Sequence, residues 1–111
     1  MAIGDVTPKK LFQGAISATA TAKYTCPASN RAQVCEIWMA NTGTTDRTVT
    51  IYAHGIATTN IIACGVPVKA GESQCLVDNK IILAATETLG FKQDVGTDIV
   101  ATVYGYEEQV V

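Results

Sequence analysis

The chain has 111 residues, of which 48% are hydrophobic and 16% are charged, and its formal net charge is -2. This length is typical of one domain, which can bury roughly two-thirds of its unfolded surface. A slightly acidic chain has no basic stripe with which to neutralise phosphates, so we do not expect nucleic acid as a partner. The charged fraction is low against about 25% in an ordinary soluble domain, which indicates a surface poor in charge.

The N-terminal residues, MAIGDVTPKK, carry no apolar periodicity. They lack the basic segment and continuous apolar run of a secretory signal, and no apolar run in the chain is long enough to cross a bilayer. We therefore expect a protein made in a cytoplasm and no membrane partner. Pro8 followed by Lys9 and Lys10 predicts that residues 1–10 form an arm that docks on a neighbour, leading into one domain over residues 11–111.

Short alternating segments separated by turn residues fill the first half of that domain. Strands are predicted over residues 11–17 and 20–26. The clearest pattern spans residues 33–53. Its first arm places Cys35, Ile37 and Met39 on one face, and its second arm does the same with Val49, Ile51 and Ala53. The tip between them, residues 41–46, is rich in Asn, Thr, Gly and Asp, so the segment predicts a half-buried antiparallel hairpin.

The second half continues in the same manner, with a predicted turn at Asp78–Lys80. Further strands are predicted over residues 56–68, 74–77, 81–83, 88–92 and 98–107. In the last of these, odd-numbered residues from Ile99 to Gly105 form one face, and even-numbered residues from Val100 to Tyr106 form the other. No window keeps a helical apolar period without a Gly, Pro or Thr interruption. Eight or nine short strands predict a single antiparallel β-sandwich, jelly-roll or immunoglobulin-like, with no long helix.

The cysteine content does not require disulfides. Cys26 and Cys35 flank one predicted turn, and Cys64 and Cys75 flank another, so the two members of each pair would face each other across a hairpin. A disulfide within each pair is therefore the alternative to free thiols. We expect all four to be reduced, because cytoplasmic thiols stay reduced and free cysteine packs as a small apolar side chain. A zinc site is disfavoured, since there is no CxxC motif and only one histidine.

The sequence predicts no catalytic residue, no cofactor and no metal. His54 stands beside Gly55 at a strand end, where a turn residue with a solvated ring is favoured over a general base. Asp94 and Asp98, with Gln93, lack the dense oxygen-ligand spacing of a calcium loop. No G-x-S-x-G, H-E-x-x-H or glycine-rich phosphate loop occurs, so we do not expect an enzyme.

The aromatic residues suggest a contact surface. If Ile37 and Met39 face the core, Trp38 faces away from it, and the same alternation turns several tyrosines outward. These side chains are either single exposures, covered by a loop, or part of a subunit interface, where Trp and Tyr are enriched and charge is depleted. The candidate interface residues are Trp38, Tyr52, Tyr104, Tyr106, Pro8, Lys9 and Lys10.

Four segments, I-W-M-A-N-T, R-T-V-T-I-Y, V-K-A-G-E-S and D-I-V-A-T-V-Y-G-Y-E, together resemble those of small virion structural proteins of tailed bacteriophages. The resemblance runs from about Leu11 to Glu107. It implies a β-sandwich subunit, commonly trimeric, that is added to a capsid, a fibre or the tail apparatus. The matching positions are fold determinants and not a catalytic set.

We therefore expect a non-enzymatic protein of the virion, an oligomeric capsid decoration or cement subunit. Its expected partners are its own copies, as a homotrimer, and another structural protein such as the major capsid or tail protein. One alternative is a tail, baseplate or fibre accessory subunit. Another is a carbohydrate-binding sandwich, in which Trp38 and Tyr52 would form the platform that stacks on a sugar.

Overall fold

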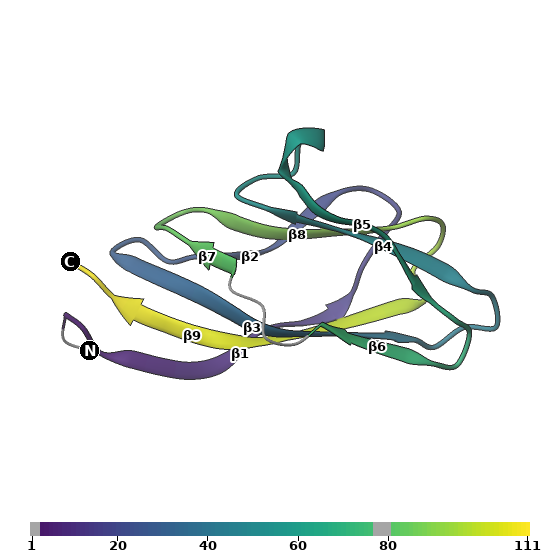
Figure 1. The fold of residues 1–111 in the computed structure, drawn as a ribbon, viewed down its shortest axis with the longest axis horizontal. Helices are drawn as coiled ribbons and strands as arrows, with labels where there is room; N and C mark the ends of the chain where they lie inside the picture. Colours follow the sequence, from purple (N-terminus) through teal and green to yellow (C-terminus); the bar gives the residue numbers. More distant parts are fainter. Residues whose placement is uncertain (1–2, 77–80) are drawn as a thin grey trace.

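The computed structural model describes residues 3–76 and 81–111, and the turn predicted at Asp78–Lys80 lies outside them. The described residues form nine strands and one short 3-10 turn, arranged as two antiparallel sheets that pack face to face (Figure 1). The predicted single β-sandwich with no long helix is confirmed. None of the described segments is a helix long and apolar enough to span a bilayer.

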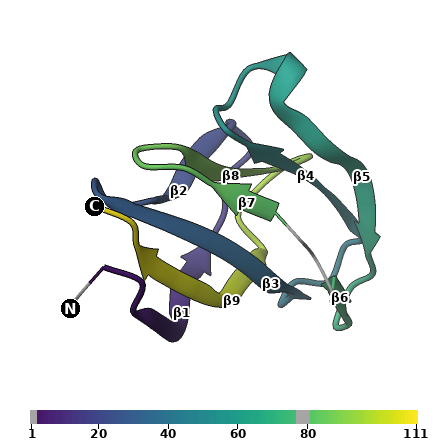
Figure 2. The same cartoon turned by 60° about the vertical axis from the view of Figure 1, so that its left-hand side comes forward.

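Sheet A is the lower layer in Figure 1 and has the strand order β1–β9–β3–β6, with β7 also paired to β3. Its strands are β1 (Val6–Ala15), β3 (Asn30–Asn41), β6 (Ser73–Leu76), β7 (Ile81–Leu83) and β9 (Ile99–Gln109). The long strand β9 lies between β1 and β3, and β6 and β7 pair with different parts of β3 (Figure 2). Three long strands therefore give sheet A a broad outer face.

Sheet B is the second layer and has the order β2–β8–β4–β5. Its strands are β2 (Thr21–Thr25), β4 (Arg47–Ala53), β5 (Ile61–Val68) and β8 (Thr88–Gln93). The 3-10 turn (Thr58–Asn60) precedes β5, so only the second part of the strand predicted over residues 56–68 forms. That turn projects from the top of the molecule in Figure 1.

The hairpin predicted over residues 33–53 is wrong, because β3 belongs to sheet A and β4 to sheet B. Residues 42–46 instead carry the chain from one sheet to the other. Asn41 holds this corner: its side-chain nitrogen donates to the carbonyl oxygens of Thr45 at 2.8 Å and Val68 at 3.0 Å, and its oxygen accepts from the backbone N–H of Gly43 at 2.9 Å. Two strands that face one core from opposite sheets show the same alternation as a hairpin pair.

The core lies between the two sheets and is built from their inward side chains. Ile37 and Met39 from sheet A meet Val49 and Ile51 from sheet B, and all four are at most 1% exposed. The alternation predicted for β9 is confirmed, since Ile99, Ala101, Val103 and Gly105 are all buried. Across the core, the rings of Phe12 and Phe91 have centroids 6.3 Å apart.

Strand β1 begins earlier than the sequence predicts. Val6 to Lys10, expected to be part of an arm, pair in register with Glu108 to Tyr104 of β9. Among the described strands, β1 pairs with β9 alone, and an edge strand tolerates Pro8, which cannot donate a hydrogen bond to a neighbour. Thr, Pro and Lys at such an edge hide the alternation that would reveal the strand. That residues 1–10 dock on a neighbour stays a prediction.

The two neighbours of β9, β1 and β3, each contain a register shift beside Tyr104. The register shifts between Lys10 and Phe12 in β1 and between Val34 and Glu36 in β3. The second shift leaves Cys35 half-buried, outside the face of Ile37 and Met39 on which the alternation placed it. A β-bulge adds one residue to a strand and so reverses the faces of the residues that follow, which simple alternation cannot anticipate.

Candidate interaction surface

The outer side of sheet A carries the exposed aromatic side chains of the molecule. Trp38 on β3 is 44% exposed, and Tyr104 and Tyr106 on β9 are each 42% exposed, which confirms the predicted outward direction of all three. The register places Tyr106 beside Pro8 of β1, and it places Tyr104 between Lys10 of β1 and Glu36 of β3. We call this surface the aromatic face and define it by Pro8, Lys10, Glu36, Trp38, Tyr104 and Tyr106.

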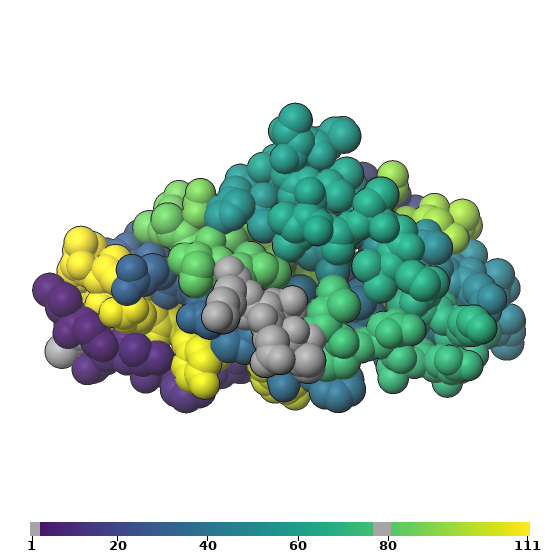
Figure 3. Space-filling view, viewed as in Figure 1, coloured from purple at the N-terminus to yellow at the C-terminus, as the bar shows by residue number. Residues whose placement is uncertain are grey.

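Strand pairing explains why residues far apart in the sequence meet on this face. Each outward side chain of β9 stands in a row with outward side chains of β1 and β3, because directly opposite residues in an antiparallel pair point to the same side. None of the described segments lies beneath sheet A in Figure 1, and side chains of β1 and β9 form part of the lower border in Figure 3. Within residues 3–76 and 81–111, no segment covers this face.

Tyr106 stands between two shallow hollows on the aromatic face. Val6 and Ile82 help to line the first hollow, and Lys10, Glu36 and Tyr104 help to line the second. Both hollows are open to solvent rather than enclosed, so they suit protruding side chains of a partner better than a small molecule held in a cavity.

The charges of the aromatic face are only partly compensated within the subunit. At one end, Arg31 Nη2 lies 2.6 Å from Glu108 Oε1. Near the centre, Lys10 Nζ donates to the neutral side chain of Gln13 at 2.9 Å, and Glu36 accepts from Trp38 Nε1 at 3.3 Å. Within residues 3–76 and 81–111, Lys10 and Glu36 form no ion pair.

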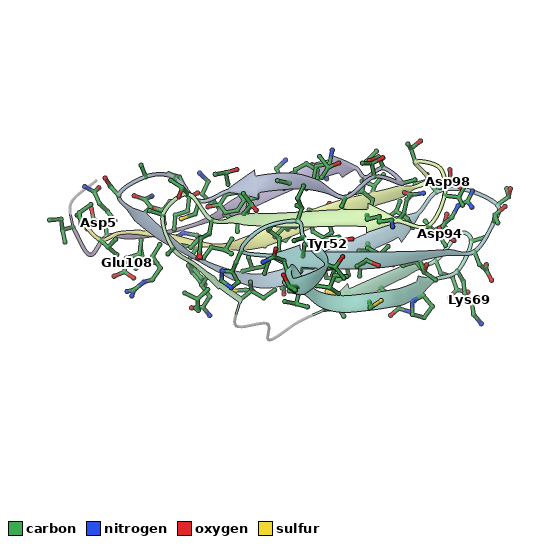
Figure 4. All side chains as sticks on the ribbon, turned by 90° about the horizontal axis from the view of Figure 1, so that it is seen from above. Asp5, Tyr52, Lys69, Asp94, Asp98 and Glu108 are labelled. Carbon is green, nitrogen blue, oxygen red and sulfur yellow. The ribbon has the colours of Figure 1, made fainter. Side chains whose placement is uncertain are left out.

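Two of the predicted interface residues do not belong to the aromatic face as defined. Lys9 pairs opposite Gly105 and its Nζ lies 3.1 Å from Glu107 Oε1, although it also lines the hollow beside Tyr104. Tyr52 is in sheet B and only 6% exposed, so its predicted exposure is wrong (Figure 4). Since Trp38 and Tyr52 belong to different sheets, the sugar platform predicted from this pair is also wrong.

A segment that crosses the outer side of sheet B lies next to the position of Tyr52 and accounts for its burial. Tyr52 pairs opposite Gly90, and a Cβ added at Gly90 would lie 2.9 Å from Ile56 Cγ2. The missing side chain of Gly90 thus lets the loop before the 3-10 turn approach the sheet. Covering by a loop was one of the alternatives for the aromatic residues, and for Tyr52 it is the correct one.

His54 and Glu87 contact each other at the surface of the molecule. His54 has a left-handed backbone with φ of 70°, and its Nδ1 lies 3.0 Å from Glu87 Oε1. Glu87 also accepts from the backbone N–H of Ala84 at 2.7 Å. The hydrogen bond from Ala84 and then that from His54 lower the pKa of Glu87. His54 is exposed, in agreement with a turn residue whose ring is solvated.

The acidic loop near residue 94 is organised by internal hydrogen bonds. Arg47 Nη2 lies 3.0 Å from Asp98 Oδ2, and Asp94 accepts from the backbone N–H of Val95. The buried side chain of Gln93 donates to the carbonyl of Val95 at 2.5 Å and accepts from the N–H of Ile99 at 3.0 Å. In the described part of the chain, no three His, Cys, Asp or Glu side chains gather in a way that could hold a metal ion.

The four cysteines are free, and they range from fully buried to exposed. Burial, followed by the negative charges of Glu107 and Glu87, raises the pKa of Cys26. Burial and then Glu36 raise the pKa of Cys35 and Cys75. These three thiols are therefore held in the protonated form, which is a poor nucleophile.

One buried polar cluster was missed by the sequence reasoning. Glu107 is 6% exposed; it accepts a hydrogen bond from Tyr24 Oη at 2.5 Å, and its other carboxylate oxygen lies 3.1 Å from Lys9 Nζ. The alternation of β9 contains the signal, because extending the inward series from Gly105 by two residues reaches Glu107. The cluster ties β1, β2 and β9 together at one end of the sandwich.

Comparison with known proteins finds a similar fold and no matching family. No family model and no curated protein matches the chain. A solved chain from Bacillus endospore appendages, described as disulfide-linked pili, is 16% identical with a TM-score of 0.58, and the match covers 99% of this chain and 93% of that one. A chain from the T13 particle of infectious bursal disease virus is 11% identical with a TM-score of 0.47, over 99% of this chain and 36% of that one. At these identities, what is shared is the β-sandwich.

Proposed function

We propose that this chain is a non-enzymatic structural subunit that assembles through the aromatic face. The observation that carries the proposal is the grouping of Trp38, Tyr104 and Tyr106 on one open sheet face of a protein in which only 16% of residues are charged. Trp and Tyr contribute large rigid contact areas and are enriched in interfaces, where each buried Å² of apolar surface contributes about 25 cal/mol.

The outer face of sheet B provides the contrast within the same molecule. Its outward residues on β4 and β8 include Thr48, Thr50 and Lys92, and the loop around Ile56 covers part of the remainder. Only sheet A combines a broad surface with exposed aromatic rings. Exposed aliphatic side chains also occur on β5 and in the loop before it, at Ile62 and Ile56, so the aromatic rings are what distinguishes sheet A.

We further propose that the subunit belongs to a tailed-bacteriophage virion, where it decorates or cements the capsid. Its partners would be its own copies and the major capsid protein, and the homotrimer implied by the sequence resemblance stays a prediction. A single sandwich domain with one open face suits a subunit added to a surface that already exists. A tail, baseplate or fibre accessory role uses the same surface and differs only in the site of attachment.

The test is to add purified protein to phage particles that lack it and to follow binding by electron microscopy. A decoration subunit should appear on heads and raise their resistance to heat or low salt, and Trp38→Ala should weaken both effects. Lys92→Glu, on the opposite sheet, is the matched control and should behave as the unchanged protein. Binding confined to tails would replace the decoration role by the accessory role, and binding to neither part would contradict a virion function.

A further inference from the structure

We propose that the aromatic face takes a second copy of this chain, packed face to face about a two-fold axis that runs parallel to β9. The inference rests on the proposed function, because it names the partner for the same surface. A surface that contacts the identical surface of a copy forms an isologous interface, which requires a two-fold axis. For two sheets in contact whose strands lie along those of the partner, that axis lies between the sheets and runs either along the strands or across them.

The central row of the aromatic face distinguishes the two directions. Tyr104 stands in this row with Lys10 on one side and Glu36 on the other, and each neighbouring strand is about 4.8 Å away. An axis along β9 exchanges the two sides, so Lys10 faces Glu36 of the partner subunit. An axis across the strands keeps each strand over its own copy, so Lys10 faces the partner's Lys10.

Electrostatics therefore favour the axis along β9. Within the described residues, the side-chain hydrogen bonds of Lys10 and Glu36 go to the neutral groups of Gln13 and Trp38, and neither charge takes part in an ion pair there. The pair would contain two Lys10–Glu36 contacts related by the axis. The opposite arrangement would place two like charges together at each site, which costs several kcal/mol in an interface.

The remaining contacts fit the same arrangement. An axis along β9 brings Tyr104 against the partner's Tyr104, and aromatic rings attract each other in offset or edge contacts in addition to the effect of the area that they bury. Stacked sheets lie about 10 Å apart, and the twist of each sheet carries its outlying parts away from the partner. Contact is therefore strongest near the Tyr104 row. The more distant Arg31 and Glu108 neutralise each other within the subunit at 2.6 Å and need no partner charge.

Charge reversal provides a direct test by analytical ultracentrifugation of the full chain. Lys10→Glu and Glu36→Lys should each raise the dimer dissociation constant by about 10-fold or more, because each creates two like-charge contacts. The double variant restores both attractions and should return to within about 3-fold of the unchanged protein. Lys92→Glu on sheet B should have no effect. Circular dichroism checks that each variant is folded, which the surface location of these side chains allows.

The inference and the proposed function fail in different ways. If the dissociation constant of the double variant is raised by as much as the two single changes combined, the two-fold pair is wrong. A mass that corresponds to an odd number of copies, such as a homotrimer, would also contradict it. If Trp38→Ala still weakens association in that case, assembly through the aromatic face stands. If the unchanged protein and all of these variants are monomeric, both the two-fold pair and assembly through the aromatic face are contradicted.

Discussion

At the scale of single residues, the buried carboxylate of Glu107 is the clearest determinant of stability. Its two oxygens meet Tyr24 Oη and Lys9 Nζ. Burial, and then the hydrogen bond and charge of Glu107, raise the pKa of Tyr24, so its hydroxyl remains a donor throughout the physiological range. Removal of one partner from a buried charged group costs more than the bond itself contributes, because the group stays desolvated.

We expect Tyr24→Phe to lower the free energy of unfolding by about 1–3 kcal/mol, since Glu107 then loses its buried donor. Urea denaturation followed by circular dichroism measures the change. Tyr106→Phe is the matched control: its ring is exposed on the aromatic face, and its effect on unfolding should stay within about 0.5 kcal/mol. Equal effects of the two variants would show that Glu107 does not depend on Tyr24.

Glu87 introduces a dependence of stability on pH. Its pKa is lowered by the N–H of Ala84 and then by His54, so the folded state favours the charged carboxylate. This contribution is fully present above the ordinary glutamate pKa of about 4.3 and is lost as the pH falls through the lowered value. Between pH 6 and pH 3, the free energy of unfolding should fall less for Glu87→Gln than for the unchanged protein, as measured by denaturation at both pH values. An identical loss would contradict the role of Glu87.

The cysteines should differ in their reaction with iodoacetamide. Cys64 is exposed on β5, whereas Cys26 is 1% exposed and its pKa is raised chiefly by burial. We expect rapid modification of Cys64 in the folded protein and modification of Cys26 only after denaturation. Mass spectrometry of peptides from a timed reaction measures both rates. Early modification of Cys26 would mean that the core opens on the timescale of the reaction.

At the scale of strands, Gly105 permits the two irregularities beside β9. A Cβ added at this position would collide with the backbone oxygen of Gln33 and would lie 3.0 Å from Leu11 Cδ1. We expect Gly105→Ala to destabilise the fold by about 1–3 kcal/mol, because the close neighbour is backbone and can move only if β3 moves. Thermal unfolding measures this, with Val100→Ala on the outward side of β9 as the control. An unchanged melting temperature for Gly105→Ala would show that β3 adjusts freely.

The strands also show which information the sequence contains. Alternation correctly predicts the inward faces of β4 and β9, since burial depends on local position. It does not determine which strands pair, and β3 and β4 therefore look like a hairpin although they lie in opposite sheets. It also fails beyond a bulge, as Cys35 illustrates, because one inserted residue is invisible in a pattern of apolar and polar side chains.

The candidate surface was partly predictable for the same reason. Trp38, Tyr104 and Tyr106 follow from the alternation, and the pairing of β9 with β3 then brings them to one face. Tyr52 was misplaced because its burial involves a loop that approaches over Gly90, a contact between segments distant in sequence. The opposition of Lys10 and Glu36 across Tyr104 depends on strand register, which the sequence alone does not give.

At the scale of the whole molecule, the two outer faces are unequal. Sheet A carries the exposed aromatic rings, whereas sheet B carries Thr48, Thr50 and Lys92 together with the exposed Ile62 on β5 and a covering loop. A sandwich with one such face can join copies to one another or to a larger surface while its other face remains in solvent. Many weak contacts of this kind become a stable attachment when several subunits bind together.

Size-exclusion chromatography with light scattering tests self-association through the aromatic face most directly. The unchanged protein should elute with a mass that is a multiple of the monomer mass and falls on dilution. Tyr104→Ala should shift this equilibrium toward the monomer while its circular dichroism spectrum stays the same. A monomer mass for the unchanged protein at every concentration up to the solubility limit would contradict the account.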